Sequence, residues 1–305
     1  MRILLLVNAS ASSVTARARV VIQKALAADH DISVAETSRR GHAARLAQGA
    51  AADGFDAVVV LGGDGTLNEA ANGLAGSQTA LGVLPGGSTN VFARTIGMTN
   101  DPIEATGELL AALARRSIRR VGLGNVNGRY FLFHVGMGLD AAVVEQVERR
   151  ATLKRYASHP LFLYSALGTW LRHYDRSRPR FAVCTTESVI DDVYFAVCLK
   201  TNPYTFLGNR PLDLDPGAGF DTGLSLVVPR TLGMVPIMSL ALAALRGRGG
   251  PRLAHHRKVV YAGDLQKVTV TGYGPFPYQA DGDYLGEAEH LELRYEPDAL
   301  TLILP

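Results

Sequence analysis

Short apolar runs and amphipathic stretches alternate over the first 114 residues of the chain. The apolar runs have the length of β-strands and lie at 2–8, 32–37, 57–62 and 81–84. Stretches with helical spacing lie at 14–28, 42–52, 66–74, 89–96 and 101–114. Because strands that alternate with helices form a parallel sheet with helices on both faces, this pattern predicts a doubly wound α/β domain.

The pattern changes near residue 122, after which strand signals dominate. Asn127-Gly128 separates Val126 from the apolar run at 130–133, which is the signal of a two-residue type I′ hairpin. Short β-rich runs follow at 180–185, 192–200, 224–228, 258–262 and 266–272. We therefore expect an α/β domain over residues 1–122 and an all-β, sandwich-like domain over residues 123–289.

Two of the predicted strands end in glycine-rich turns, and a helix follows each turn. The first turn is Gly-Gly-Asp-Gly at 62–65, and the second is Pro-Gly-Gly-Ser at 85–88. Glycine admits positive φ and close backbone approach, and the first N–H groups of a helix lack partners and favour an anion. Both turns follow strands of one parallel sheet, so we expect them side by side at a phosphate site. For the first turn alone, an ordinary flexible connection is the alternative.

Thr66 follows the first glycine turn and predicts where the next helix begins. Thr66 and Glu69 have the spacing of a capping box, in which the hydroxyl binds the N3 amide and the carboxylate binds the cap amide. We therefore expect a helix start at Thr66, with the amides of its first turn directed towards phosphate.

Composition agrees with a folded enzyme. Hydrophobic residues make up 47% and charged residues 19% of the chain, which leaves no room for long disorder. The net charge of +3 is too small to indicate nucleic acid as a partner. Cys184 and Cys198 lie in apolar runs and are expected to be small core residues. The apolar start at 3–7 is shorter than the roughly seven residues of a signal peptide, so we expect a first strand and a cytoplasmic protein.

Two familiar nucleotide motifs are not supported. Gly136, Gly138 and Ala141 match a G-x-G-x-x-A fingerprint, but the acidic residue expected about 20 positions later is missing, since 157–161 is Ala-Ser-His-Pro-Leu. This argues against a dinucleotide oxidoreductase. The chain also has no GxxxxGK[ST] motif, so a phosphate site must use mainly backbone amides.

Three motifs together resemble the diacylglycerol kinase catalytic-domain family of soluble bacterial lipid kinases, a group that includes sphingosine and ceramide kinases. They are GGDGTLNE at 62–69, PGGSTN at 85–90 and DGD at 281–283. GGDGT alone also occurs in NAD kinases and is related to a phosphofructokinase motif. The resemblance implies that a nucleotide binds the first domain, that a lipid binds the second, and that residues 290–305 return to the first domain.

The resemblance also implies the residues of an ATP and Mg²⁺ site. Asn8 at the end of the first strand and Thr37 before Gly-His-Ala at 41–43 would border the nucleotide. Asp64 would bind Mg²⁺ directly or through water, because this ion prefers oxygen ligands. The expected nucleotide-binding residues are Asn8, Thr37, Gly62, Gly63, Asp64, Gly65, Thr66, Asn68 and Ser88.

Two acids of the second domain depart from the family pattern. The family usually has Asp-Gly-Glu with the glutamate as general base, whereas this chain has Asp283 at that place, which is shorter by roughly 1.5 Å. We expect Asp283 to be the base, with a solvated turn as the alternative. The family's Asp-Asp-Gly is linked to a structural Mg²⁺, but Thr222 here replaces the second acid. Either Asp221 still serves that metal or the site is empty.

Two segments combine apolar residues with basic ones, although no apolar run reaches the roughly 18–20 residues that span a bilayer. Such a combination is typical of a surface that binds anionic phospholipid reversibly, and a core helix with a basic edge is the alternative. The basic residues of segment 149–180 are Arg149, Arg150, Lys154, Arg155, Arg172, Arg176, Arg178 and Arg180. Those that follow the apolar stretch 232–245 are Arg246, Arg248, Arg252, Arg257 and Lys258.

The sequence therefore favours an ATP-dependent lipid kinase that phosphorylates a primary hydroxyl of diacylglycerol, or of a related lipid such as sphingosine. Its product from diacylglycerol would be phosphatidic acid. An NAD kinase-like enzyme and a non-catalytic nucleotide-binding lipid sensor are the alternatives. As partners we expect a lipid substrate at the membrane surface and anionic phospholipid but no nucleic acid, and a homodimer is left open.

Overall fold

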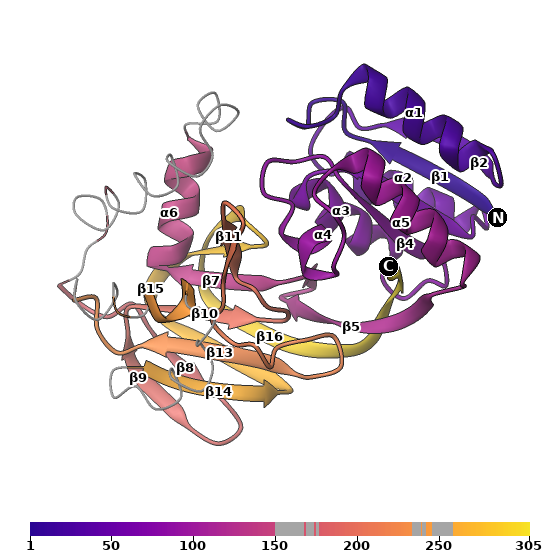
Figure 1. Cartoon of the computed structure of the whole chain (residues 1–305). Helices are drawn as coiled ribbons and strands as arrows, with labels where there is room; N and C mark the ends of the chain where they lie inside the picture. The colour runs from indigo at the N-terminus through magenta and orange to yellow at the C-terminus, as the bar shows by residue number, and fades with distance from the viewer. Residues whose placement is uncertain (150–167, 169–173, 175–176, 234–238, 240–241, 246–258) are drawn as a thin grey trace. The chain divides into compact units, whose positions relative to one another are not determined.

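The computed structural model describes residues 1–149, 168, 174, 177–233, 239, 242–245 and 259–305. The chain divides into two compact units, one of residues 1–123 with 297–305 and the other of residues 124–296 (Figure 1). This boundary differs by one residue from the one that the sequence predicts. The return to the first unit starts at Pro297 rather than at residue 290, because residues up to Arg294 still pair with a strand of the second unit.

The first unit alternates strands and helices, and its strands pair in parallel in the order β4-β3-β1-β2. The final residues of β16 complete the sheet, since Leu302 lies beside Leu81 of β4. The elements are β1 (Arg2–Val7), α1 (Ala16–Ala27), β2 (Asp31–Glu36), α2 (His42–Ala52), β3 (Ala57–Gly62), α3 (Asp64–Leu74), β4 (Ala80–Pro85), α4 (Val91–Thr95) and α5 (Pro102–Ala114).

Helices cover both faces of this sheet. The chain moves outward from β1 to β2, then back across β1 to β3 and on to β4. Because such crossovers are right-handed, α1 lies on one face and α2 and α3 lie on the other. The helix contacts agree, since α2 packs on α3 and α1 packs on α5 (Figure 1). Every residue of β3 and β4 is therefore buried, which explains their continuous apolar runs.

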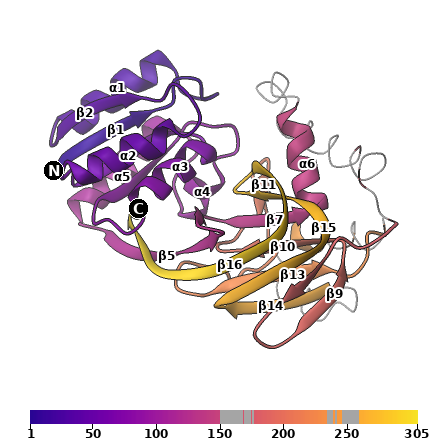
Figure 2. The same cartoon turned by 180° about the vertical axis from the view of Figure 1, so that it is seen from behind.

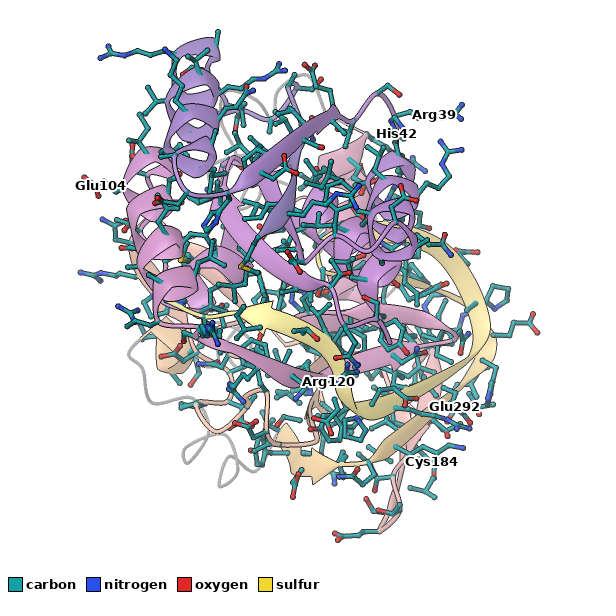
Figure 3. All side chains as sticks on the ribbon, turned by 90° about the vertical axis from the view of Figure 1, so that its right-hand side faces the viewer. Arg39, His42, Glu104, Arg120, Cys184 and Glu292 are labelled. Carbon is teal, nitrogen blue, oxygen red and sulfur yellow. The ribbon has the colours of Figure 1, made fainter. Side chains whose placement is uncertain are left out.

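The return of the chain to the first unit is fixed by hydrogen bonds. Arg120 of β5 (Ile118–Val126) donates from Nε to the carbonyl of Asp298 at 2.8 Å and from a terminal nitrogen to the carbonyl of Ser77 at 3.1 Å (Figure 3). The amide of Gly76 donates to the carbonyl of Ala299 at 2.8 Å. These bonds place the last strand beside β4.

The second unit is β-rich and largely antiparallel, in the order β14-β13-β10-β7-β15-β16 (Figure 2). The β5–β6 hairpin is as predicted, since Asn127 and Gly128 have φ of 48° and 90°. The elements are β5 (Ile118–Val126), β6 (Arg129–Phe131), β7 (His134–Gly138), α6 (Leu139–Glu148), β8 (Phe181–Cys184), β9 (Val189–Val193), β10 (Phe195–Leu199), β11 (Thr205–Leu207), β12 (Arg210–Leu212), β13 (Leu224–Pro229), β14 (Val259–Leu265), β15 (Lys267–Ala280) and β16 (Asp283–Ile303).

β15 is long enough to pair with two different strands. Its first half pairs with β8 and its last residues pair with β7. Its pairing with β16 on the other side shifts register between Thr271 and Phe276. Side chains from these strands share one core, in which the rings of Phe181 and Phe276 lie 4.7 Å apart. Cys198 belongs to that core and burial raises the pKa of its thiol to about 12, whereas Cys184 is half-buried.

Two strand predictions were incomplete. The stretch at 192–200 contains the end of β9 and all of β10 rather than one strand. β16 extends over 21 residues, most of which no predicted strand covers. Its first part alternates between exposed acids and residues such as Leu291 and Leu293, whose side chains are buried, so it lacks a continuous apolar run. Among the described residues, no helix is long and apolar enough to cross a membrane.

The predicted capping box at Thr66 is wrong. α3 begins at Asp64, two residues earlier, and its cap residue Gly63 makes no side-chain cap bond. The Glu69 carboxylate instead accepts the amides of Gly41 at 2.7 Å and Ala43 at 3.1 Å. These amides lie at the start of α2, so Glu69 caps the helix packed against its own.

A buried histidine stands at the start of β7. His134 is 4% exposed, and its ring centroid lies 4.3 Å from that of Tyr204 and 5.1 Å from that of Phe133. Burial lowers the pKa of His134 to about 4, while the charge of Asp140 raises it in part. The imidazole is therefore neutral at pH 7.

Glu69→Ala should destabilise the first unit, because the amides of Gly41 and Ala43 lose a charged acceptor. We expect a loss of about 1–2 kcal/mol in urea unfolding. Glu104→Ala, which changes an exposed acid of α5 (Figure 3), is the control and should cost no more than about 0.5 kcal/mol. Equal losses in the two variants would contradict the capping role.

The free energy of unfolding should decrease as the pH is lowered, because His134 is buried in its neutral form. Its folded-state pKa lies below the ordinary value of 6.5, so the unfolded chain takes up the proton first as the pH falls. Between pH 7 and pH 5 this linkage removes about 2 kcal/mol. His134→Gln should flatten the dependence by that amount in urea unfolding at the two pH values. A variant with the wild-type slope would show that His134 does not titrate as described.

Candidate functional site

The two glycine turns of the first unit lie in contact. Gly62 pairs with Pro85 across the parallel strands, and the amide of Gly86 donates to the carbonyl of Gly62 at 2.8 Å. A Cβ on Gly87 would lie 2.8 Å from the Cα of Gly63, and one on Gly86 would lie 2.9 Å from the Cα of Gly62. The prediction that the turns lie side by side is confirmed, with backbone packed directly on backbone.

Close approach, rather than unusual dihedral angles, requires glycine at position 63. Gly63 has φ −87° and ψ 176°, an extended conformation that other residues adopt readily. A Cβ on Gly63 would stand 3.3 Å from the Cα of Gly87, so a side chain here presses on the opposite turn.

Asp64 links the first turn to the second. Its Oδ2 accepts the amide of Val91 and its Oδ1 accepts the amide of Phe92, both at 3.0 Å. These amides begin α4, so a carboxylate of one turn caps the helix that follows the other. Among the described residues, no group of three or more His, Cys, Asp or Glu side chains is arranged to hold a metal ion. Mg²⁺ binding by Asp64 therefore stays a prediction.

Asn8 and Thr66 join the first turn to the end of β1. The amide of Asn8 donates to the carbonyl of Leu61 at 3.0 Å, and its Nδ2 donates to Oγ1 of Thr66 at 2.9 Å. Thr37 lies just beyond β2, where its amide donates to the carbonyl of Val7 at 2.9 Å. These residues surround the point between β1 and β3 where the strand order reverses, which is where open α/β sheets bind ligands.

Two other expected nucleotide contacts differ in exposure. Ser88 is exposed in the second glycine turn. Asn68 is only 1% exposed, and its Oδ1 accepts Nδ2 of Asn72 one helical turn later at 3.2 Å. This burial favours a structural role for Asn68, and its contact with nucleotide stays a prediction.

In the second unit, Asp281 holds the chain that leads into β7. It is 4% exposed, and its carboxylate accepts the amides of Leu132 at 2.6 Å, Phe133 at 2.9 Å and His134 at 3.1 Å. Sequence reasoning gave this residue no role and chose the other acid of the same motif. The presence of two acids in one motif was the signal that could have revealed this role, because one acid can be structural while the other is catalytic.

Asp283, the predicted base, contacts a cation. Its Oδ2 accepts a terminal nitrogen of Arg129 at 3.0 Å, and its side chain is 23% exposed. Asp283 begins β16 directly after the turn at 281–282, so its backbone position follows from that turn. The pair leaves Asp283 as a partly exposed carboxylate held by a guanidinium.

Asp140 holds the turn before Asp283 through the side chain of Gln279. Its Oδ2 accepts Nε2 of Gln279 at 2.7 Å, and Oε1 of Gln279 accepts the amide of Gly282 at 2.9 Å. The hydroxyl of Tyr204 also donates to Asp140. A Cβ on Gly136 would overlap the Asp140 carboxylate. The Gly-x-Gly-x-Asp motif at 136–140 therefore leaves room for this carboxylate.

The predicted metal ligand Asp221 is exposed in the turn at 219–223, ahead of β13. Thr222, which replaces the second acid of the family motif, uses its hydroxyl within the turn. It accepts the amide of Gly219 and donates to the carbonyl of Gly219, both at 3.1 Å. Metal binding by Asp221 stays a prediction.

Known proteins are similar to this chain both in sequence and in fold. The model of the diacylglycerol kinase catalytic domain matches residues 2–126. The diacylglycerol kinase of Bacillus subtilis (strain 168) is 39% identical over 121 residues, which make up 39% of this chain and 39% of that protein. The diacylglycerol kinase of Staphylococcus carnosus (strain TM300) is 25% identical over 286 residues, which make up 92% of this chain and 88% of that protein.

A solved structure shares the whole fold. The crystal structure of a diacylglycerol kinase from Bacillus anthracis str. Sterne superposes with a TM-score of 0.77 at 20% identity, over 100% of this chain and 97% of that one. The alignment with the Bacillus subtilis protein, by contrast, spans less than half of that relative's length. Residues 2–126 of this chain are therefore similar in sequence to the diacylglycerol kinase catalytic domain.

Proposed function

We propose that this protein is an ATP-dependent lipid kinase that transfers the γ-phosphoryl group to a primary hydroxyl of diacylglycerol, or of a related lipid such as sphingosine. The product from diacylglycerol would be phosphatidic acid. The observation that carries the proposal is the contact between the glycine turns at 62–65 and 85–88, at the reversal of strand order in a unit that matches the diacylglycerol kinase catalytic domain. Similarity to diacylglycerol kinases supports lipid over NAD as acceptor.

The first unit offers what a phosphate group needs. α3 begins at Asp64, and the amide of Leu67 makes its first helical bond, to the carbonyl of Gly63. The first amides of an α-helix have no acceptor in the turn before them, and the helix dipole favours an anion at this end. With no lysine of a GxxxxGK[ST] motif, the residues of 62–66 would bind phosphate mainly through their backbone.

Mg²⁺ would supply positive charge to offset that of the phosphates and so favour transfer. Asp64 supplies oxygen atoms of the kind that this ion prefers, and its place within the first turn suits a ligand near phosphate. Its carboxylate is held in a fixed orientation by the amides of Val91 and Phe92. We therefore propose that Asp64 holds the ion directly or through water.

Asp283 is the proposed general base. It would accept the proton of the lipid hydroxyl as that oxygen attacks phosphorus, while Arg129 keeps the carboxylate oriented. Asp281 and the Asp140–Gln279 pair fix the turn that precedes Asp283, so the base stands on an ordered backbone. This anchoring supports a working base despite the side chain being one methylene shorter than that of glutamate.

The proposal also includes binding of the protein to a membrane surface. The substrate would be met at a membrane that contains anionic phospholipid, through the basic and apolar segments 149–180 and 232–258. These segments lie mainly outside the described residues, and so do Arg246, Arg248, Arg252, Arg257 and Lys258. The support for this part is therefore the sequence pattern.

The direct test uses purified protein with γ-labelled ATP and Mg²⁺ against diacylglycerol, sphingosine, ceramide and NAD. We expect label in a lipid product. Label in NAD would support the NAD kinase alternative instead. ATP binding without transfer to any acceptor would support the lipid sensor.

Gly87→Ala should weaken ATP binding, because the new methyl group would lie 2.8 Å from the Cα of Gly63 and must push the turns apart. We expect the affinity to fall by about tenfold or more, since 1 Å errors in placement are costly. Calorimetric titration with ATP and Mg²⁺ measures it.

Gly107→Ala is the matched control for this substitution. A Cβ on Gly107 meets nothing within 4 Å, and the residue lies inside α5, where alanine favours the helix. ATP affinity should stay at the wild-type value. If Gly87→Ala also bound ATP as the wild type does, the glycine turns would not be the phosphate site.

Asp283→Asn should lower turnover by about 10²–10⁴-fold, because the amide keeps the shape of the side chain but cannot accept the proton. ATP affinity and the melting temperature should change little. Asp281→Asn is the comparison, since it weakens bonds to three buried amides and should lower the melting temperature, which Asp283→Asn should not. Wild-type turnover by Asp283→Asn would remove Asp283 from the chemistry.

A further inference from the structure

A buried lysine lies beside the turn at 219–223. Lys200 follows β10, and its side chain is 0% exposed. Its Nζ donates to the carbonyl of Gly219 at 2.5 Å and to the carbonyl of Thr222 at 2.7 Å. Two main-chain oxygens at opposite ends of one tight turn therefore bind the same ammonium group.

The surroundings of Lys200 suit a cation. Nζ lies 4.5 Å from the centre of the Tyr295 ring, and the hydroxyl of Tyr295 donates to the carbonyl of Phe220 at 3.2 Å. Burial lowers the pKa of Lys200 to about 8, and the charges of Asp221 and Asp264 raise it. At pH 7 the amine is therefore still mainly an ammonium.

The Lys200 ammonium supplies positive charge beside the turn without a metal. Thr222 stands in place of the second acid of the family motif, and the charges of Asp221 and Asp264 both act on the ammonium. Asp264 also holds the turn, since its Oδ1 accepts the amide of Gly223 at 2.7 Å. A cation of the protein itself therefore lies among the acids around the turn.

We propose that the Lys200 ammonium is the cation that closes the turn at 219–223, in place of a divalent ion, and that this turn binds no metal. Mg²⁺ needs near-octahedral oxygen ligands at about 2.0–2.1 Å. The carbonyls of Gly219 and Thr222 already accept the ammonium, and the Thr222 hydroxyl is used within the turn. The described part of the chain offers no cluster of three acids here.

The residues at the end of β10 link the turn at 219–223 to the segment that Asp281 binds. The amide of Lys200 donates to the carbonyl of Phe133 at 2.8 Å, and Oγ1 of Thr201 donates to the carbonyl of Leu132 at 3.2 Å. The amides of the same segment, 132–134, are those that Asp281 accepts. Lys200 therefore contacts this segment through its backbone and the turn at 219–223 through its ammonium group.

The test compares melting temperatures of nucleotide-free, full-length protein in EDTA and in millimolar Mg²⁺. For the wild type we expect a difference below about 1 °C. Lys200→Ala should melt several degrees lower, because two buried carbonyls lose their donor, and Mg²⁺ should not restore it. Lys200→Ala combined with Thr222→Asp restores the second acid and empties the cation position. Mg²⁺ should then raise the melting temperature by about 4 °C or more.

A wild-type protein that is stabilised by Mg²⁺, and that loses this response in Asp221→Asn, would overturn the proposal. So would Lys200→Ala with wild-type stability in EDTA. If Lys200→Ala fails to fold, Lys200→Arg keeps the charge and should retain insensitivity to EDTA, and dependence on Mg²⁺ in that variant would also overturn the proposal. These readouts need no lipid and no phosphoryl transfer, so they stand apart from the kinase assay.

Discussion

The candidate site depends on the backbone contact between two glycine turns. Parallel pairing brings Gly62 beside Pro85, and the amide of Gly86 donates to the carbonyl of Gly62 at 2.8 Å. No side chain fits between the turns, and the Asp64 carboxylate then holds the second turn by accepting the amides that begin α4. This single contact places the backbone of both turns where the strand order reverses. Backbone amides there can bind phosphate even though the chain has no P-loop lysine.

The acids of the motifs hold backbone amides in most cases. Glu69 accepts two amides at the start of α2, Asp64 accepts two of α4, and Asp281 accepts three ahead of β7. Bonds from amides to a charged oxygen are stronger than neutral ones, and a buried amide without a partner is costly. Among these motif acids, Asp283 stands apart because its carboxylate pairs with the Arg129 side chain, which makes it the acid best suited to chemistry.

The sequence predicted most of the first unit because β3 and β4 are buried on both faces and therefore appear as continuous apolar runs. It missed most of β16, whose alternating residues face a core on one side only. The capping box failed because the partners of Glu69 lie 26 and 28 residues away on a neighbouring helix, beyond the reach of a local pattern. For the same reason, the motif at 281–283 indicated an acid but not which acid is structural, since the amides that bind Asp281 are nearly 150 residues distant.

Two departures from the family pattern in the second unit have a common physical explanation. The kind of cation that can pair with a carboxylate depends on whether a second acid lies beside it and on how far its side chain reaches. At 219–223 one acid is missing and the cation is the Lys200 ammonium, bound by two carbonyls. At Asp283 the acid is shorter and a guanidinium, that of Arg129, lies 3.0 Å from it. In both places a side chain of the protein provides the positive charge, and its position is fixed by the fold rather than by ion concentration.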